Sequence, residues 1–99
     1  MDYEITITRS EDDSKGRYEA RVAGRDGMGE LTYSRLSATR VIADHTGVDD
    51  SLRGTGVGMA LVERLIADAR AEGFTIFPLC PYVRAQYQRH PEWSDVVQP

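Results

Sequence analysis

The amino-acid sequence predicts an α+β fold, in which a mixed, mostly antiparallel sheet contains one βαβ unit and is followed by a short C-terminal helix. The first third of the chain alternates apolar and polar residues, residues 56–72 have helical periodicity, and short apolar runs flank that helix. Alternation is typical of half-buried strands, and a helix between two apolar runs is typical of parallel strands joined by a crossover. The 99 residues are expected to form one domain, spanning 1–99.

Three strands are predicted in the first third of the chain, over residues 4–9, 18–23 and 29–35. Each alternates apolar and polar side chains, as a strand with one buried face does. The segments between them are polar or rich in glycine, which favours turns. We therefore expect these strands to form an antiparallel meander.

The next strand is predicted over residues 38–46, where Val41, Ile42 and Ala43 are consecutive apolar residues. Such a run is typical of a strand that is covered on both faces. Residues 74–79 form another short, mostly apolar run. Because a helix joins these two strands, we expect them to be parallel.

The helix between these strands is predicted from apolar residues spaced three and four positions apart, namely Leu61, Val62, Leu65, Ile66 and Ala69. This spacing places them on one face of an amphipathic helix. Gly73 follows at the position of a left-handed C-terminal cap. We therefore expect the helix to end there.

A second helix is predicted from Pro81 to about His90. Proline is favoured in the first turn of a helix, and Pro91 would end this one. The tail over residues 93–99 is expected to add a short segment at the edge of the sheet.

The charge balance argues against nucleic acid and membranes as partners. Sixteen acidic and twelve basic residues give a net charge of -4, which repels nucleic acid and anionic lipid. No segment approaches the roughly 20 apolar residues of a membrane-spanning helix, and residues 1–4 contain no basic cluster of the kind that begins a targeting segment. Cytoplasmic residence is the expectation that follows.

Cys80 is the only cysteine, so an internal disulfide and a multi-cysteine metal site are excluded. The two histidines, His45 and His90, are far apart in sequence and show no metal-ligand spacing. No metal site is expected. Cys80 is either a small buried residue or a reactive thiol.

Three alternate glycines, Gly54, Gly56 and Gly58, lead into the longest predicted helix. The first backbone N–H groups of a helix have no intrahelical partner, and the helix dipole favours an anion there. Glycines leave these groups accessible, and the forked guanidinium of Arg53 suits phosphate oxygens. The loop is therefore a candidate phosphate site, although glycines that serve packing alone would give the same pattern.

Spacing excludes two other phosphate-binding motifs. A Walker loop ends in Gly-Lys-Ser/Thr, whereas the only lysine here is Lys15. A dinucleotide fingerprint that started at Gly54 would need glycine where Met59 stands. ATP hydrolysis and NAD binding are therefore not expected.

The loop resembles the pyrophosphate loop of the GNAT acetyltransferase superfamily, Arg/Gln-x-x-Gly-x-Gly/Ala, through Arg53, Gly56 and Gly58. Leu-Cys-Pro-Tyr-Val at residues 79–83 and His-Pro-Glu-Trp at 90–93 are similar to a subgroup of small GNAT-like domains of about this length, which have a cysteine after the fifth strand. The resemblance covers residues 41–97 well and the N-terminal meander only in topology.

This resemblance implies that acetyl-CoA is the cofactor, with its pantetheine arm between strands 38–46 and 74–79. The residues that would contact acetyl-CoA are Thr46, Val48, Arg53, Gly54, Thr55, Gly56, Val57, Gly58, Met59 and Tyr87. Tyr87 is similar in placement to the tyrosine that many GNAT enzymes have near the departing sulfur, although core packing is the commoner role for such a residue.

Cys80 and His45 are the candidate catalytic residues. Both are expected where the carboxyl ends of the two parallel strands open, a common ligand position in α/β sheets. The thiolate of Cys80 would be favoured at a helix N-terminus, and His45 would act as a base for an incoming amine or for Cys80. The alternatives are an inert buried thiol and a histidine that only hydrogen-bonds at the strand end.

The expected function is acetyl transfer from acetyl-CoA to an amine acceptor, either a small molecule or a protein. The transfer would proceed by direct attack or through an acetyl-Cys80 intermediate. The chain lacks the two N-terminal helices that commonly shape the acceptor pocket in the superfamily, so a CoA-binding or acyl-CoA-sensing module without turnover, which acts through a partner protein, is the alternative function.

Overall fold

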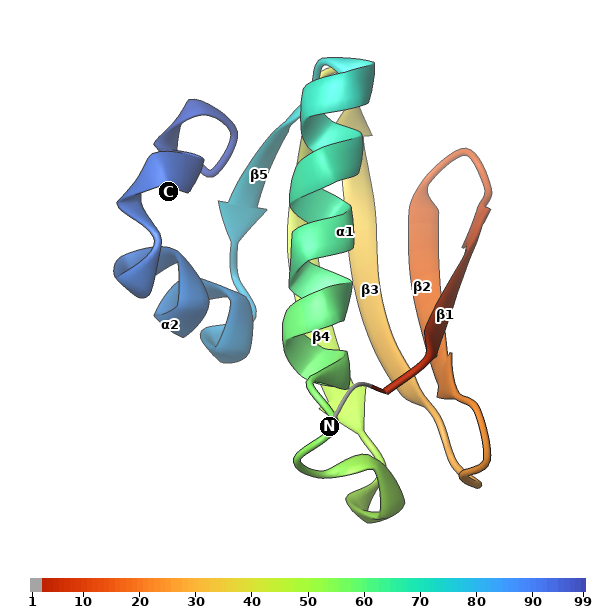
Figure 1. The fold of residues 1–99 in the computed structure, drawn as a ribbon. Coiled ribbons are helices and arrows are strands. Elements are labelled where there is room, and N and C mark those ends of the chain that lie inside the picture. Colours follow the sequence, from red (N-terminus) through yellow and green to blue (C-terminus); the bar gives the residue numbers. More distant parts are fainter. Residues whose placement is uncertain (1–2) are drawn as a thin grey trace.

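The computed structural model describes residues 3–99, in which five strands form one sheet in the order β1-β2-β3-β4-β5 (Figure 1). The strands are β1 Ile5–Glu11, β2 Lys15–Val22, β3 Gly29–Ser37, β4 Arg40–Val48 and β5 Thr75–Pro78. The helices are α1 Val57–Glu72 and α2 Pro81–Arg89, with 3₁₀ turns η1 Asp50–Leu52 and η2 Pro91–Asp95. The predicted α+β fold is confirmed. Residues 1 and 2, part of the segment in which a targeting signal was sought, lie outside the described residues.

Neighbouring strands are antiparallel from β1 to β4, and only β4 and β5 are parallel. The β1–β2 turn is tighter than the polar stretch after residue 9 predicts, since Glu11 already pairs with Gly16. The Asp12 carboxylate makes this turn possible, because it accepts hydrogen bonds from the backbone N–H groups of Ser14 and Lys15, both at 2.8 Å. These two bonds, with a third from the Ser14 hydroxyl, lower the pKa of Asp12.

A β-bulge interrupts the pairing of β3 with β4. Thr32 lies opposite His45, and the next residue, Tyr33, lies opposite Ala43, so that Asp44 is the extra residue. A bulge bends a strand and changes the direction of its side chains. The bulge therefore sets which side chains of β4 point to each face of the sheet.

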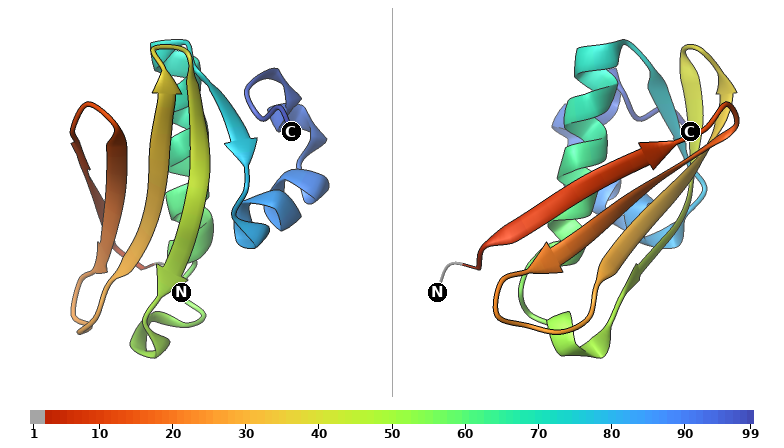
Figure 2. Two further views of the ribbon diagram at one scale, coloured as in Figure 1. Left: turned by 180° about the vertical axis from the view of Figure 1, so that it is seen from behind. Right: turned by 90° about the vertical axis from the view of Figure 1, so that its right-hand side faces the viewer.

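Helix α1 covers one face of the sheet and buries the predicted apolar stripe (Figure 2). Val41 and Ala43 are fully buried on this face, whereas Ile42 is only half-buried on the other face. Seen from behind, β3 and β4 lie in front of α1, and no helix lies over strands β1–β4 on this side (Figure 2). The expectation that β4 is covered on both faces is therefore wrong.

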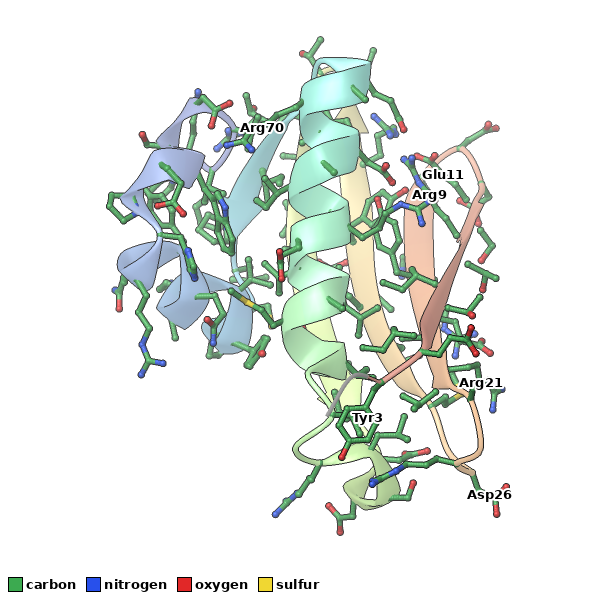
Figure 3. All side chains as sticks on the ribbon, in the orientation of Figure 1. Tyr3, Arg9, Glu11, Arg21, Asp26 and Arg70 are labelled. Carbon is green, nitrogen blue, oxygen red and sulfur yellow. The ribbon has the colours of Figure 1, made fainter. Side chains whose placement is uncertain are left out.

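Helix α1 ends as predicted at Gly73, which has a φ of 78° and donates its N–H to Ala69. The C-terminal tail returns to the outer edge of β5, where Ile76 and Val97 form an isolated parallel bridge. Arg70 of α1 holds this tail through Asp95 at 3.0 Å (Figure 3). The predicted edge segment is thus present. No helix in the described part of the chain is long and apolar enough to span a membrane.

A cluster of charges joins β1 to α1 over the buried tyrosines (Figure 3). The Asp68 carboxylate accepts hydrogen bonds from the Tyr18 hydroxyl at 2.7 Å and from Arg9 Nη1 at 3.2 Å. Arg9 also pairs with Glu72 and Glu11. The hydrogen bond to Glu72 raises the pKa of Arg9, and burial raises the pKa of Tyr18. Both side chains therefore keep their protons at neutral pH.

Asp68→Ala is expected to lower the free energy of unfolding by about 2 kcal/mol, because it leaves the buried Tyr18 hydroxyl without an acceptor. Urea unfolding measures this. The matched control is Glu63→Ala on the exposed face of the same helix, which is expected to be nearly neutral. Equal losses for the two variants would contradict an anchoring role for Asp68.

Candidate functional site

A cleft of about 460 Å³ lies where β4 continues past the end of β5 and meets the start of α1. It is lined by Thr46, Val48, Leu52, Arg53, Gly54, Gly56, Val57, Gly58, Met59 and Tyr82. Eight of these ten residues were expected from the sequence to contact a cofactor, with Leu52 and Tyr82 as the additions. The structure thus brings the strand and loop candidates together in one cavity.

The cleft exists because the parallel pairing of β4 and β5 is short. It covers four residue pairs and ends with Ala43 opposite Pro78. Cys80 makes the last contact between the two segments, donating its backbone N–H to the Ala43 carbonyl at 2.8 Å. Pro81 then begins α2, and β4 continues alone to Val48. The two strands therefore part between Ala43 and Thr46.

The start of α1 presents unpartnered backbone N–H groups to this cleft. Gly56 is the N-cap, has a φ of 85° and offers no side chain to cap the helix. The first N–H to bond inside the helix is that of Ala60, which donates to Gly56. Within the described chain, the N–H groups of Val57, Gly58 and Met59 therefore have no hydrogen-bond acceptor. Free N–H groups at a helix N-terminus favour a negatively charged ligand.

Positive φ angles at Gly54 and Gly56, 79° and 85°, shape the loop before the helix. A Cβ atom built at either position has no neighbour within 4 Å, so the space beside the loop is open. The Arg53 side chain, 81% exposed, pairs with Asp50 at 3.1 Å. Such an exposed pair is weak, so the guanidinium is free to turn toward an anion in the cleft. In contrast, Thr55 is buried and donates its hydroxyl to the Leu52 carbonyl at 2.6 Å.

Cys80 lies beside the cleft through its contact with Thr46. Its side chain is buried, with 3% exposed, and Sγ is 3.4 Å from Thr46 Oγ1. Thr46 in turn lines the cleft. A thiol here has a hydroxyl neighbour at the point where the strands separate. No group of three or more His, Cys, Asp or Glu side chains suited to a metal ion occurs among residues 3–99.

Comparison with known proteins identifies the family of this fold and loop. A family model described as GCN5-related N-acetyl-transferase matches residues 17–96. The chain belongs to the GCN5-related N-acetyltransferases. A solution structure of a GCN5-like protein from Staphylococcus aureus is similar, with 25% sequence identity and a TM-score of 0.64 over 92% of this chain and 87% of that chain. No curated protein matches the sequence.

In this N-acetyltransferase, His45 points to the face opposite the cleft. Residues alternate faces after the bulge, so that Thr46 and Val48 face the cleft and His45 shares the other face with Gly47. A Cβ built at Gly47 would lie 3.1 Å from His45 Nε2. The structure therefore separates the imidazole of His45 from the thiol of Cys80. It leaves His45 exposed on the open face of the sheet.

The tyrosine of α2 that lines the cleft is Tyr82, whereas Tyr87 packs half-buried against the core. A Cβ built at Gly58 would lie 2.8 Å from the Tyr82 hydroxyl, so this glycine allows the phenol to lie over the start of α1. Partial burial raises the pKa of Tyr82, which therefore stays a hydrogen-bond donor at neutral pH. The signal in the sequence was its position in the first turn of a helix that follows β5.

We expect Cys80 of the native protein to react with a thiol reagent roughly 100-fold more slowly than in urea, because the buried thiol is reached only by local opening. Absorbance at the reagent's product band follows the reaction. Thr46→Val keeps the shape and removes the hydroxyl, so slow labelling of this variant attributes the protection to burial. Labelling at the rate of the unfolded chain would contradict the buried position.

Proposed function

We propose that this chain is an acetyl-CoA-dependent N-acetyltransferase that moves an acetyl group to an amine acceptor. The observation that supports this most is the cleft in which unpartnered N–H groups of α1 stand at one end and Cys80 adjoins the other. A diphosphate and a thioester at the two ends of one flexible arm match this arrangement. Acetyl-CoA has that combination, and it supplies the activated acetyl group.

The residues at the phosphate end fit a diphosphate. The free N–H groups of Val57, Gly58 and Met59 donate to its oxygens, and the open space beside Gly54 and Gly56 admits it to the backbone. Arg53 adds a mobile positive charge at the rim, once it leaves Asp50. This local positive potential acts against a net charge of -4 for the whole chain.

The β4 segment beyond the bulge fits the amide groups of the pantetheine arm. Leu31, Glu30 and Gly29 of β3 pair with residues 46–48 on one side only. Backbone groups in a strand point alternately to its two neighbours, and β5 has already ended on the other side. Backbone N–H and C=O groups at the free edge of residues 46–48 therefore hold the arm as a further strand would.

Two routes of transfer are chemically open. In direct attack, the amine displaces CoA from the acetyl carbon, and a proton lost by the amine ends on the departing sulfur. In the covalent route, the Cys80 thiolate accepts the acetyl group first, after movement that exposes its buried Sγ. Thr46 lies 3.4 Å from this sulfur and orients it in either case.

The phosphate site is tested by titrating CoA into Gly56→Ala in a calorimeter. We expect about tenfold weaker binding, because a methyl group would lie beside the diphosphate. The matched control is Gly73→Ala, which also has a φ of 78° and open space around it but lies at the opposite end of α1. Both variants carry the same left-handed strain, about 1 kcal/mol in unfolding free energy. Equal CoA affinities for the two variants would reject the site.

The route is tested by mass spectrometry of the protein after incubation with acetyl-CoA. An acetyl group on Cys80 that disappears when an amine is added supports the covalent route. Cys80→Ala would then retain CoA affinity and lose transfer. If Cys80→Ala transfers acetyl groups at the normal rate, the covalent route is excluded and direct attack remains.

The burial of Cys80 also favours a second candidate, a CoA- or acyl-CoA-binding module without turnover that acts through a partner protein. Such a module would use the same loop and the same free edge of β4. CoA binding without acetyl release for any amine of a broad panel would establish this second function. Absence of CoA binding would remove both.

A further inference from the structure

A second hollow, of about 700 Å³, extends from the β1–β2 turn along the open face of the sheet, where no helix covers it. We propose that this hollow binds the acetyl acceptor, and that the acceptor is a small molecule with both a primary amine and a carboxylate. This inference rests on the proposed acetyltransferase function. The volume of the hollow lies in the range of small-molecule sites rather than of extended protein interfaces.

The β4 bulge directs two polar side chains to this face. Asp44, the extra residue, lines the hollow and accepts a hydrogen bond from Ser34 Oγ through Oδ2 at 2.6 Å. His45 follows it and lies opposite Thr32, another residue of the hollow. Without the bulge, Asp44 and His45 would alternate between faces. Their common face is thus a consequence of one inserted residue.

The acceptor side and the cleft meet at the point where β4 and β5 separate. Asp44 follows Ala43, whose carbonyl accepts the N–H of Cys80. Cys80 lies next to Thr46, which faces the cleft on the α1 side of the sheet, whereas Asp44 lies on the open face. A thioester near Cys80 and an amine at Asp44 would therefore approach each other through the gap between the strands.

The charged residues of the hollow are not equally available. Arg17 pairs with Glu19 and Glu30, and Glu11 pairs with Arg9 and Arg35. The Asp12 carboxylate is held by the N–H groups of the β1–β2 turn, close enough to Lys15 for the lysine charge to help lower the pKa of Asp12.

Two charged groups of the hollow remain without an ion pair among the described residues. Asp44 has a carboxylate oxygen with no donor, and Lys15 has no carboxylate within 4 Å. These are one negative and one positive charge, both directed into the same hollow. An acceptor with one group of each sign neutralises both.

Lys15 and Asp44 lie on the two strands that flank Ser34. Lys15 pairs with Ser34 across β2 and β3, and Asp44 contacts Ser34 from β4. Strands are spaced about 4.8 Å apart, so the two backbones are roughly 10 Å apart, a gap that the long, flexible side chain of Lys15 can shorten. An amino acid fits this gap, with its ammonium group at Asp44 and its carboxylate at Lys15.

This orientation turns the amine toward the thioester. The ammonium group gives one proton to His45, which passes it to solvent. The neutral nitrogen then bonds to the acetyl carbon while the carbon–sulfur bond breaks. The second nitrogen proton ends on the departing CoA sulfur, so that the products are an N-acetyl amino acid and CoA. The carboxylate of the acceptor remains at Lys15 throughout.

The test measures initial rates of CoA release with three acceptors that each have three carbon atoms: β-alanine, propylamine and 1,3-diaminopropane. We expect the native protein to prefer β-alanine by about tenfold in kcat/KM, and Lys15→Glu to prefer the diamine instead. Asp44→Asn is expected to raise KM for all three amines. Arg89→Glu is the control, because it changes the charge equally at an exposed site on α2 outside the hollow.

CoA affinity is measured for every variant, so that failure of the proposed acetyltransferase is recognised separately as absence of CoA binding. Backbone NMR with β-alanine gives a readout that needs no turnover. Shifts centred on Lys15, Ser34 and Asp44, and abolished by Asp44→Asn, support the hollow as the acceptor site. A preference for propylamine or the diamine in the native protein, or shifts centred elsewhere, would overturn the proposal.

Discussion

The parallel contact between β4 and β5 is the constraint on which the site depends. Pro78 has no N–H to donate to β4, and the last bond between the two segments comes from the backbone of Cys80. Pairing that continued along β4 would fill the cleft with a strand and leave no free backbone edge at residues 46–48. Pro78 ends β5 and Pro81 begins α2. Together they leave the backbone edge of residues 46–48 in β4 free for a ligand.

Much of the scaffold could be predicted because its signals are local. The apolar spacing of α1, Gly73 after it and the glycines before it each report on neighbouring residues, and the structure has all three as predicted. The faces of β4 could not be predicted in this way. The bulge at Asp44 is set by pairing with β3, so the orientation of His45 depends on tertiary register. Tyr82 was missed for a similar reason, since the docking of α2 determines which tyrosine meets the cleft.

Ion pairs between β1 and α1 contribute to the stability of the fold, because β1 buries little apolar surface. Helix α1 packs on β1, whereas α2 packs on β4 and β5 at the other side of the sheet, and β1 itself has only two half-buried apolar residues, Ile5 and Ile7, with which to attach. Arg9 supplies a further attachment through Asp68 and Glu72 of α1, at the edge of the core where side chains are partly shielded from solvent. The ion pairs form a network around the Tyr18 hydroxyl, and networks of this kind hold geometry better than isolated surface pairs.

The part of β4 that follows the bulge is intolerant of changes in length. Loss of His45 or Thr46 would shift the remaining residues of the strand by one place against β3. Either Gly47 would then replace Thr46 beside Cys80, or the loop before α1 would be drawn toward the sheet. This strand therefore accepts substitutions more readily than insertions or deletions, and the β2–β3 turn is fixed in length as well, because Arg25 and Ser51 bond it to η1.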